Sequence, residues 1–140
     1  MERTFTMVKP DAVARGETGR VLARMEAAGF RIRAMKMVQL SPAEARGFYR
    51  VHEGKPFLED LVAYMSSGPV VAIVLEREDA IQELRRVIGA TDPAQAAEGT
   101  IRREFGVDKS HNAVHASDGP QTASEEIAFF GLTLARESGC

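Results

Sequence analysis

The sequence is poor in the features that mark disulfide-rich, membrane-spanning or nucleic-acid-binding proteins. Its one cysteine, Cys140, is the last of 140 residues, which excludes an internal disulfide framework. The longest apolar run, Val70–Leu75, is far shorter than the roughly 20 residues that span a bilayer. The formal net charge of −2 gives no overall positive field to hold nucleic acid or an acidic membrane. Because Met1–Thr4 has no basic tip followed by an apolar core, we expect no signal peptide.

What remains is the composition of an ordinary globular protein. Hydrophobic residues make up 44% of the chain and charged residues 27%, close to average usage. A chain of this length suits one compact domain and is too short for two comfortable ones. We therefore predict a single cytoplasmic domain over residues 1–140, with residues 135–140 as a short C-terminal tail.

Three segments have the pattern of β-strands. Residues 4–9 predict a strand in which Phe5 and Met7 share one face, and residues 31–40 predict a second strand. The β-branched run Val70–Leu75 is typical of a central strand that is buried on both faces.

Helical spacing and helix start signals fill most of the sequence between these strands. The expected helices end at Gly29, begin after Ser41, and cover residues 57–65, 79–88 and 120–130. Residues 89–111 are irregular apart from one helical turn near 100–105, and residues 112–115 suggest a short last strand. Alternating strands and helices indicate an α/β or α+β sandwich, one sheet with helices packed on it.

The two common glycine-rich phosphate-binding motifs, G-x-x-x-x-G-K-[ST] and G-x-G-x-x-G after a strand, are missing from the sequence. A protein with this sequence that handles phosphates must do so with side chains and a metal. Lys9 ends a strand on its apolar face, and Arg85 lies on the predicted helical stripe of Ile81, Leu84 and Ile88. Taken singly, each cation is explained by a long side chain that reaches solvent from an apolar face.

The densest polar cluster is His111–Asp118. His111 and His115 are four residues apart, which on a helix could ligate zinc, but the local pattern is not helical and lacks H-E-x-x-H. The stronger hypothesis is that Glu126, on the following helix, folds back and holds the ring of His115. A carboxylate bonded to one ring nitrogen fixes the tautomer and leaves the other nitrogen free to attack a phosphorus atom.

The sequence resembles the nucleoside diphosphate kinase family from about residue 3 to about residue 130. Any one of the matching motifs is weak, but six in order at the family's spacing are very specific. They are Met7-Val8-Lys9-Pro10-Asp11, Lys55-Pro56-Phe57, Ser67-Gly68-Pro69-Val70-Val71-Ala72, Gly89-Ala90-Thr91-Asp92-Pro93-Ala94, Gly99-Thr100-Ile101-Arg102 and Asn112-Ala113-Val114-His115-Ala116-Ser117-Asp118.

The resemblance implies a ferredoxin-like sandwich with a four-stranded antiparallel sheet. It also implies a ping-pong transfer of the γ-phosphate of a nucleoside triphosphate to a nucleoside diphosphate, which maintains nucleotide pools. The matched catalytic positions are His115 as the phosphorylated residue, Glu126 as the carboxylate that positions its ring, and Ser117 as the hydroxyl that supports that carboxylate. The positions matched to groups that hold phosphate and ribose are Lys9, Tyr49, Arg85, Thr91, Arg102 and Asn112. Lys9 is also matched to a catalytic role.

The same resemblance makes Phe57 and Leu61 the pair that contacts the base. Stacking on an aromatic ring tolerates every base, so weak base selectivity should follow. Mg²⁺ is expected to arrive on the nucleotide phosphates, without side-chain ligands, and the long loop after Gly89 is expected to contribute to the nucleotide cleft and to subunit contacts. A homo-oligomer built from dimers, either a tetramer or a hexamer, is also implied.

Several positions depart from the family pattern. Ala12 and Ala116 stand where glycine is common, Arg103-Glu104 replaces Gly-Asp, and Lys109 occupies a position where some relatives place an apolar residue over the base. Ala116 would be strained if its backbone required a positive φ, although an ordinary backbone that tolerates alanine is expected. Two alternatives to the kinase stay open: a non-catalytic nucleotide- or nucleic-acid-binding module on the same fold, and a zinc hydrolase using His111 and His115.

Overall fold

A computed structural model describes residues 1–134 of the chain; the predicted tail, residues 135–140, lies outside the described residues. The elements follow in this order: β1 (Glu2–Val8), α1 (Pro10–Ala14), α2 (Thr18–Ala27), β2 (Arg31–Val38), α3 (Pro42–Phe48), the 3₁₀ turn η1 (Arg50–His52), α4 (Leu58–Met65), β3 (Val70–Arg77), α5 (Ala80–Ile88), η2 (Pro93–Gln95), α6 (Ile101–Phe105), β4 (Val114–Ala116) and α7 (Pro120–Phe129).

The four strands form one antiparallel sheet in the order β2-β3-β1-β4. This is the ferredoxin-like sandwich that the resemblance implied. Val70–Leu75 lies in the inner strand β3 and is buried along its whole length, as its β-branched sequence predicts. In β4, His115 lies opposite Met7 of β1. The short last strand therefore places the histidine beside the end of β1, which Lys9 directly follows.

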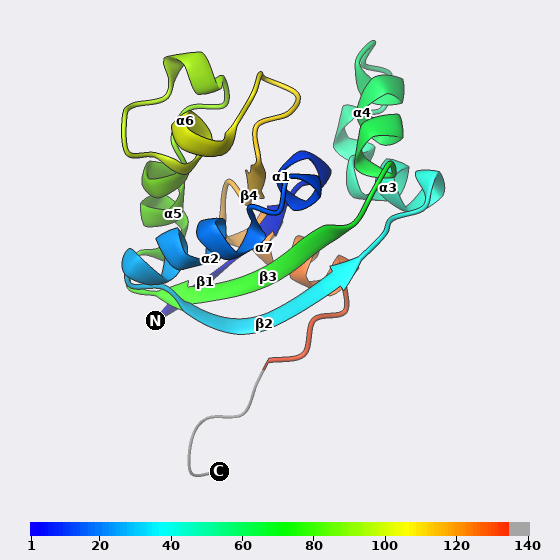
Figure 1. Cartoon of the computed structure of the whole chain (residues 1–140). Helices are drawn as coiled ribbons and strands as arrows, with labels where there is room; N and C mark the ends of the chain where they lie inside the picture. Colours follow the sequence, from blue (N-terminus) through cyan, green and yellow to red (C-terminus); the bar gives the residue numbers. More distant parts are fainter. Residues whose placement is uncertain (135–140) are drawn as a thin grey trace.

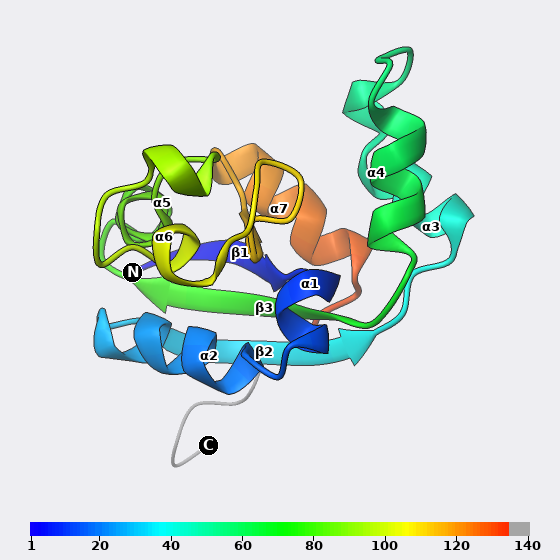
Figure 2. The same cartoon turned by 45° about the horizontal axis from the view of Figure 1, so that its top comes forward.

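Each face of the sheet packs against its own group of helices (Figures 1 and 2). On one face, Val71, Ile73 and Leu75 of β3 pack with buried residues of α2, α5 and α6. On the other face, Phe5 and Met7 pack with α3, α4 and Phe130, which directly follows α7. The α3–α4 pair stands at the end of the sheet where β2 ends and β3 begins (Figures 1 and 2).

Local sequence signals explain several helix boundaries. Ser41 and Glu44 form the reciprocal capping box that the sequence predicts at the start of α3. Gly29 adopts a φ of 90° just after α2, a conformation that favours glycine at a helix C-terminus. The helix opened by Gly119 and Pro120 is also confirmed, and ends at Phe129.

The buried faces of α4 and α5 each leave out a residue that helical spacing would group with them. In α4 the buried residues are Leu58, Val62 and Met65, whereas Phe57 is exposed and precedes the helix. In α5, Ile81, Leu84 and Ile88 are buried but Arg85 is exposed, so the expectation that Arg85 lies within the stripe was wrong. The physical reason is that an α-helix turns 100° per residue, which carries Arg85 past the buried edge of the stripe.

The remaining differences concern short elements. The helix α1 and the two 3₁₀ turns are too short to show a hydrophobic period, and the sequence did not predict them. Residues 89–111 are mostly irregular and contain α6 at residues 101–105, close to the expected helical turn. Within residues 1–134, no helix is both long and apolar enough to cross a membrane.

Candidate active site

A cleft of about 630 Å³ opens beside α4 and the loop that precedes β4. It brings together eight of the predicted site residues, namely Lys9, Tyr49, Phe57, Leu61, Thr91, Arg102, Asn112 and His115. These residues come from the end of β1, from both sides of the α3–α4 connection, from the long loop and from β4. The long loop after Gly89 therefore lines the cleft, as expected.

The ring of His115 is positioned by a carboxylate, which in turn accepts a hydrogen bond from a hydroxyl. Its Nε2 lies 2.9 Å from Oε2 of Glu126, and Oγ of Ser117 donates to Oε1 of the same glutamate at 2.5 Å. Because an ionised carboxylate only accepts hydrogen bonds, Nε2 carries the ring proton and Nδ1 keeps its lone pair. The Phe48 ring packs edge-on against the imidazole at 5.3 Å, which further restricts its rotation.

Lys9 is a buried cation beside this histidine. The residue is 8% exposed, and Nζ donates to Oδ1 of Asn112 at 2.9 Å. Burial and the nearby positive charge of Arg102 lower the pKa of Lys9 to about 8, against a smaller opposing influence of Asp11. The amide of Asn112 also donates to the carbonyl oxygen of Thr91 at 3.0 Å, which ties the long loop to this position.

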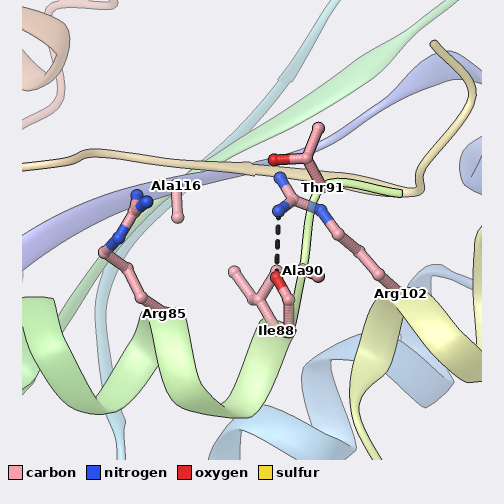
Figure 3. A pocket seen from close by; sticks show the side chains of 7 residues that line it. Arg85, Ile88, Ala90, Thr91, Arg102 and Ala116 are labelled. Carbon is pink, nitrogen blue, oxygen red and sulfur yellow. Dashed lines mark hydrogen bonds between the residues drawn. The ribbon is translucent and has the colours of Figure 1, made fainter. Parts of the chain in front are cut away.

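Arg102 and Arg85 border a smaller adjoining cavity of about 120 Å³ together with Thr91 and Ala116 (Figure 3). The two terminal nitrogens of Arg102 donate to the carbonyl oxygens of Gly89 and Val114, at 3.1 and 3.0 Å. Burial, followed by the charge of Arg85, lowers the pKa of Arg102 to about 10. Arg85 is thus near the other site residues, although it borders the smaller cavity and not the main cleft.

Two polar atoms at this site are buried without a hydrogen-bond partner among the described residues: Nε of Arg102 and the hydroxyl of Tyr49. Burial and the charge of Glu126 raise the pKa of Tyr49 above its ordinary value, so the hydroxyl stays protonated. Buried donors without partners are rare in folded proteins because each loses the hydrogen bonds it made to water. Donors and cations that converge in this way suit a ligand that brings several negative oxygens, such as a chain of phosphates.

The two histidines of the zinc hypothesis have different partners. Nδ1 of His111 lies 3.0 Å from Oδ1 of Asp108, whereas His115 is bonded to Glu126. Within residues 1–134, no group of three or more His, Cys, Asp or Glu side chains is arranged to hold a metal ion. A structural zinc site needs four such ligands and a catalytic one needs three. The arrangement therefore favours a nucleophile over a zinc ligand at His115.

The sequence did not point to several residues that line the cleft: His52, Asp60, Tyr64 and Ser110. Tyr64 lies at helical spacing from Phe57 and Leu61, which indicates the helix over residues 57–65 but no role in a site. A second apolar stripe in the same helix, Leu58, Val62 and Met65, packs into the core. This stripe is the sequence signal that could have shown that Tyr64 lies on a different face of α4.

Solved structures of known proteins share this fold over nearly the whole chain. A nucleoside diphosphate kinase from Aquifex aeolicus superposes with a TM-score of 0.90 at 51% identity, covering 92% of this chain and 94% of the other. A Halobacterium salinarum nucleoside diphosphate kinase, solved in complex with CDP, superposes with a TM-score of 0.91 at 40% identity, covering 98% and 94%. The fold is that of a phosphotransferase that acts on nucleotides.

Sequence comparison gives the particular family. The sequence model of nucleoside diphosphate kinase matches residues 2–132. A nucleoside diphosphate kinase from Pasteurella multocida is 55% identical over 130 residues, which cover 93% of this chain and 94% of that protein. The chain belongs to the nucleoside diphosphate kinase family, and it is an enzyme that transfers phosphate from nucleoside triphosphates to nucleoside diphosphates.

Proposed function

We propose that the enzyme transfers phosphate in two half-reactions through a phosphohistidine on His115. Nδ1 of His115 attacks the γ-phosphorus of a nucleoside triphosphate, the N–P bond forms, and the bond to the β-phosphate oxygen breaks as the diphosphate leaves. In the second half-reaction, a terminal phosphate oxygen of another nucleoside diphosphate attacks the phosphorus and releases the neutral ring. The observation that carries this proposal is the Ser117–Glu126–His115 chain, which leaves the lone pair of Nδ1 free.

The cations beside His115 supply the charge that phosphoryl transfer requires. The transition state spreads negative charge over three equatorial oxygens, and positioned cations and donors stabilise it. Lys9, Arg102 and the Tyr49 hydroxyl lie at the cleft, and Arg85 lies at the adjoining cavity. In this proposal Thr91 and Asn112 hold the phosphate and ribose, since both also line the cleft.

The base of the nucleotide is proposed to lie against Phe57 and Leu61. Phe57 is 48% exposed and lines the cleft together with Leu61, so its ring offers an open stacking face. The relative from Halobacterium salinarum was solved with CDP, a pyrimidine nucleotide. We infer similar use of purine and pyrimidine nucleotides, which parallel measurements of kcat/KM with ADP, GDP, CDP and UDP would test.

Mg²⁺ is proposed to be carried by the nucleotide. The residues lining the cleft include one carboxylate, Asp60, among several cations, so they fit a nucleotide-borne ion better than a protein cage. When bound, Mg²⁺ neutralises part of the phosphate charge. The protein residues hold the remaining phosphate oxygens and orient His115.

A homo-oligomer built from dimers, a tetramer or a hexamer, is also proposed. Met35 and Met37 of the edge strand β2 are 53% and 61% exposed, and exposed apolar residues on a sheet edge favour association. Light scattering would give the mass of the oligomer.

The cytoplasm stays the proposed compartment, because nucleoside triphosphates are the substrates.

The test of the proposed mechanism is to mix the protein with γ-labelled ATP and Mg²⁺ without an acceptor. We expect close to one label per chain, stable in base and labile in acid, that is discharged when GDP is added. His115→Asn serves as the matched control and should remain unlabelled. A folded wild-type protein that binds ATP but takes no label would instead support the non-catalytic binding module.

A further inference from the structure

Ala113, two residues before His115, has a backbone conformation that side chains other than glycine rarely adopt. Its φ is 74°, and the residue is completely buried. Ala116, the position at which alanine replaces a common glycine, is not among the non-glycine residues with positive φ in the described chain. The strained position therefore lies in the segment that leads the chain into the histidine, and surrounding contacts must hold it there.

Both peptide groups of Ala113 are anchored by the stretch that follows β1. Its carbonyl oxygen accepts a hydrogen bond from the backbone N–H of Lys9 at 2.8 Å. Its N–H donates to Oδ2 of Asp11 at 3.2 Å. The first contact is available to any residue at position 9 that has an N–H, whereas the second depends on the side chain of Asp11.

The residues on either side of Ala113 are hydrogen-bonded to side chains of the candidate active site. Asn112 accepts a hydrogen bond from Nζ of Lys9, and the carbonyl oxygen of Val114 accepts one from Arg102. His115 follows in β4, where it pairs with β1. A rotation of the backbone at Ala113 would thus move the amide of Asn112 and the imidazole of His115 relative to each other.

The second carboxylate oxygen of Asp11 contacts Tyr64, a residue of α4 that lines the cleft. The hydroxyl of Tyr64, on α4, donates to Oδ1 of Asp11, and it accepts a hydrogen bond from the backbone N–H of Asp11 at 3.2 Å. The Tyr64 ring lies 4.4 Å from the ring of His111, and both residues line the cleft. Burial and the hydrogen bond to Asp11 raise the pKa of Tyr64, so the hydroxyl remains a donor.

We propose that Asp11 is a positioning residue for phosphoryl transfer: it holds Ala113 in its left-handed conformation, which directs the chain into His115, and it fixes α4 across the cleft through Tyr64. The side chain of Asp11 is 6% exposed and does not line the cleft, so it acts through these neighbours and not on the nucleotide. The proposal rests on the proposed role of His115 as the phosphorylated residue.

A purely structural role for Asp11 makes a different prediction. Loss of a buried carboxylate lowers stability wherever it occurs, so a lower Tm alone does not identify a positioning residue. Glu2 provides a matched control, because its Oε1 accepts the backbone N–H of Ile81 at 2.8 Å, at the far end of β1. Glu2→Ala removes the same kind of bond away from the cleft.

The experiment measures the single-turnover rate of phosphohistidine formation at saturating labelled ATP, together with Tm, for four variants and the wild type. The variants are Asp11→Ala, Ala113→Gly, the double variant and Glu2→Ala. We expect Asp11→Ala to lower the single-turnover rate roughly 10- to 100-fold, because small displacements of a nucleophile have effects of this size. Glu2→Ala should lower Tm and leave the rate unchanged.

The glycine variant tests the mechanism of positioning. Glycine adopts a φ of 74° without strain, so the Asp11→Ala change should lower the rate much less in an Ala113→Gly protein than in the wild type. An Asp11→Ala rate equal to that of the wild type, or an equal loss in both backgrounds, would overturn the proposal. If the wild type itself takes no label, the proposed function fails instead. Labelling of the wild-type protein therefore separates failure of the proposed function from failure of the positioning role.

Asp11→Asn keeps the test decisive if Asp11→Ala does not fold. Asparagine has one acceptor oxygen where Asp11 has two, so its hold on the Ala113 N–H is weakened by competition with the Tyr64 hydroxyl. We expect a rate loss of a few fold that Ala113→Gly reduces. A loss that the glycine background leaves unchanged would contradict the positioning role.

Discussion

A cluster of charged side chains lies at each end of β1, around Arg3 near its start and around Lys9 just after its end. The two clusters differ in their balance of positive and negative charge. At the start, Glu76 accepts hydrogen bonds from Arg3 and Arg33, each at 3.0 Å. At the other end, Lys9 and Arg102 are both cations, and the partners of Lys9 Nζ and of the Arg102 terminal nitrogens are an amide and backbone carbonyls.

The pKa values follow this difference. Burial pushes the pKa of Glu76 upward, but hydrogen bonds from Arg33 and Arg3 outweigh it and hold the pKa below its ordinary value. The pKa of Lys9 is instead lowered to about 8 by burial and by Arg102. The ion cluster around Glu76 is complete within the protein, whereas we propose that the cluster beside His115 is completed by the anionic substrate.

The largest effect on turnover is expected from the substitution His115→Asn. Asparagine has no lone pair that can attack phosphorus, so turnover should fall by at least about 10⁴-fold while the fold is retained. Steady-state assays together with circular dichroism would check this. Substantial residual turnover would show that another residue carries the phosphate.

Lys9→Met removes a charge from the incomplete cluster while keeping the length of the side chain. We expect kcat/KM to fall by about 10²- to 10³-fold, because an oriented cation at the transferring phosphate is lost. The free energy of unfolding should change by less than about 1 kcal/mol, since a desolvated charge disappears together with its hydrogen bond. Urea titration would measure the second quantity, and a large loss of stability would contradict the comparison.

Glu126→Ala should lower kcat by about 10²-fold, less than His115→Asn does. The variant keeps the nucleophile but loses the hydrogen bond that fixes its tautomer and direction. Rapid-quench measurement of phosphohistidine formation would separate this effect from nucleotide binding. A loss as large as that of His115→Asn would mean that Glu126 does more than orient the ring.

Glu76→Gln should have the smallest effect on activity and a clear one on stability. It breaks the complete cluster, and we expect a loss of about 2 kcal/mol, below that of a fully buried pair because Arg3 is half exposed. Since the pKa of Glu76 is lowered in the folded protein, its stabilisation is present at neutral pH and lost as the pH falls through the folded-state pKa. Wild type and variant should therefore converge in stability in acid, with kcat/KM unchanged at pH 7.

Much of the fold and site was predictable because the relevant signals are local or belong to long motifs. Strand β3 and the capping box at Ser41 followed from patterns within short windows. The cleft residues Lys9 and His115 were singled out by their local surroundings, whereas the family resemblance implied Asn112. The pairing of His115 with Glu126 was hypothesised from the residues and then implied by the family resemblance, and the two side chains are 2.9 Å apart in the structure.

Other features could not be read from such windows. Arg85 was placed within an apolar stripe because periodicity does not resolve the edge of a buried helix face. Asp11 lies in a five-residue helix, and its contacts to Tyr64 and Ala113 span 53 and 102 residues of sequence. The positive φ of Ala113 is held by tertiary contacts and has no local signal, since alanine is normally unfavourable there.

The most direct test of the difference between the two clusters is the pKa of Lys9, measured by NMR on protein with labelled lysine side chains. We expect a pKa of about 8 in the free protein, compared with 10.5 for an ordinary lysine, so that kcat/KM falls as the pH rises through that value. Bound ADP should raise the pKa by about one unit or more, because the phosphates stabilise the charged form. An ordinary pKa in the free protein, or one that ADP leaves unchanged, would contradict the role of Lys9 as a cation held for the substrate's phosphates.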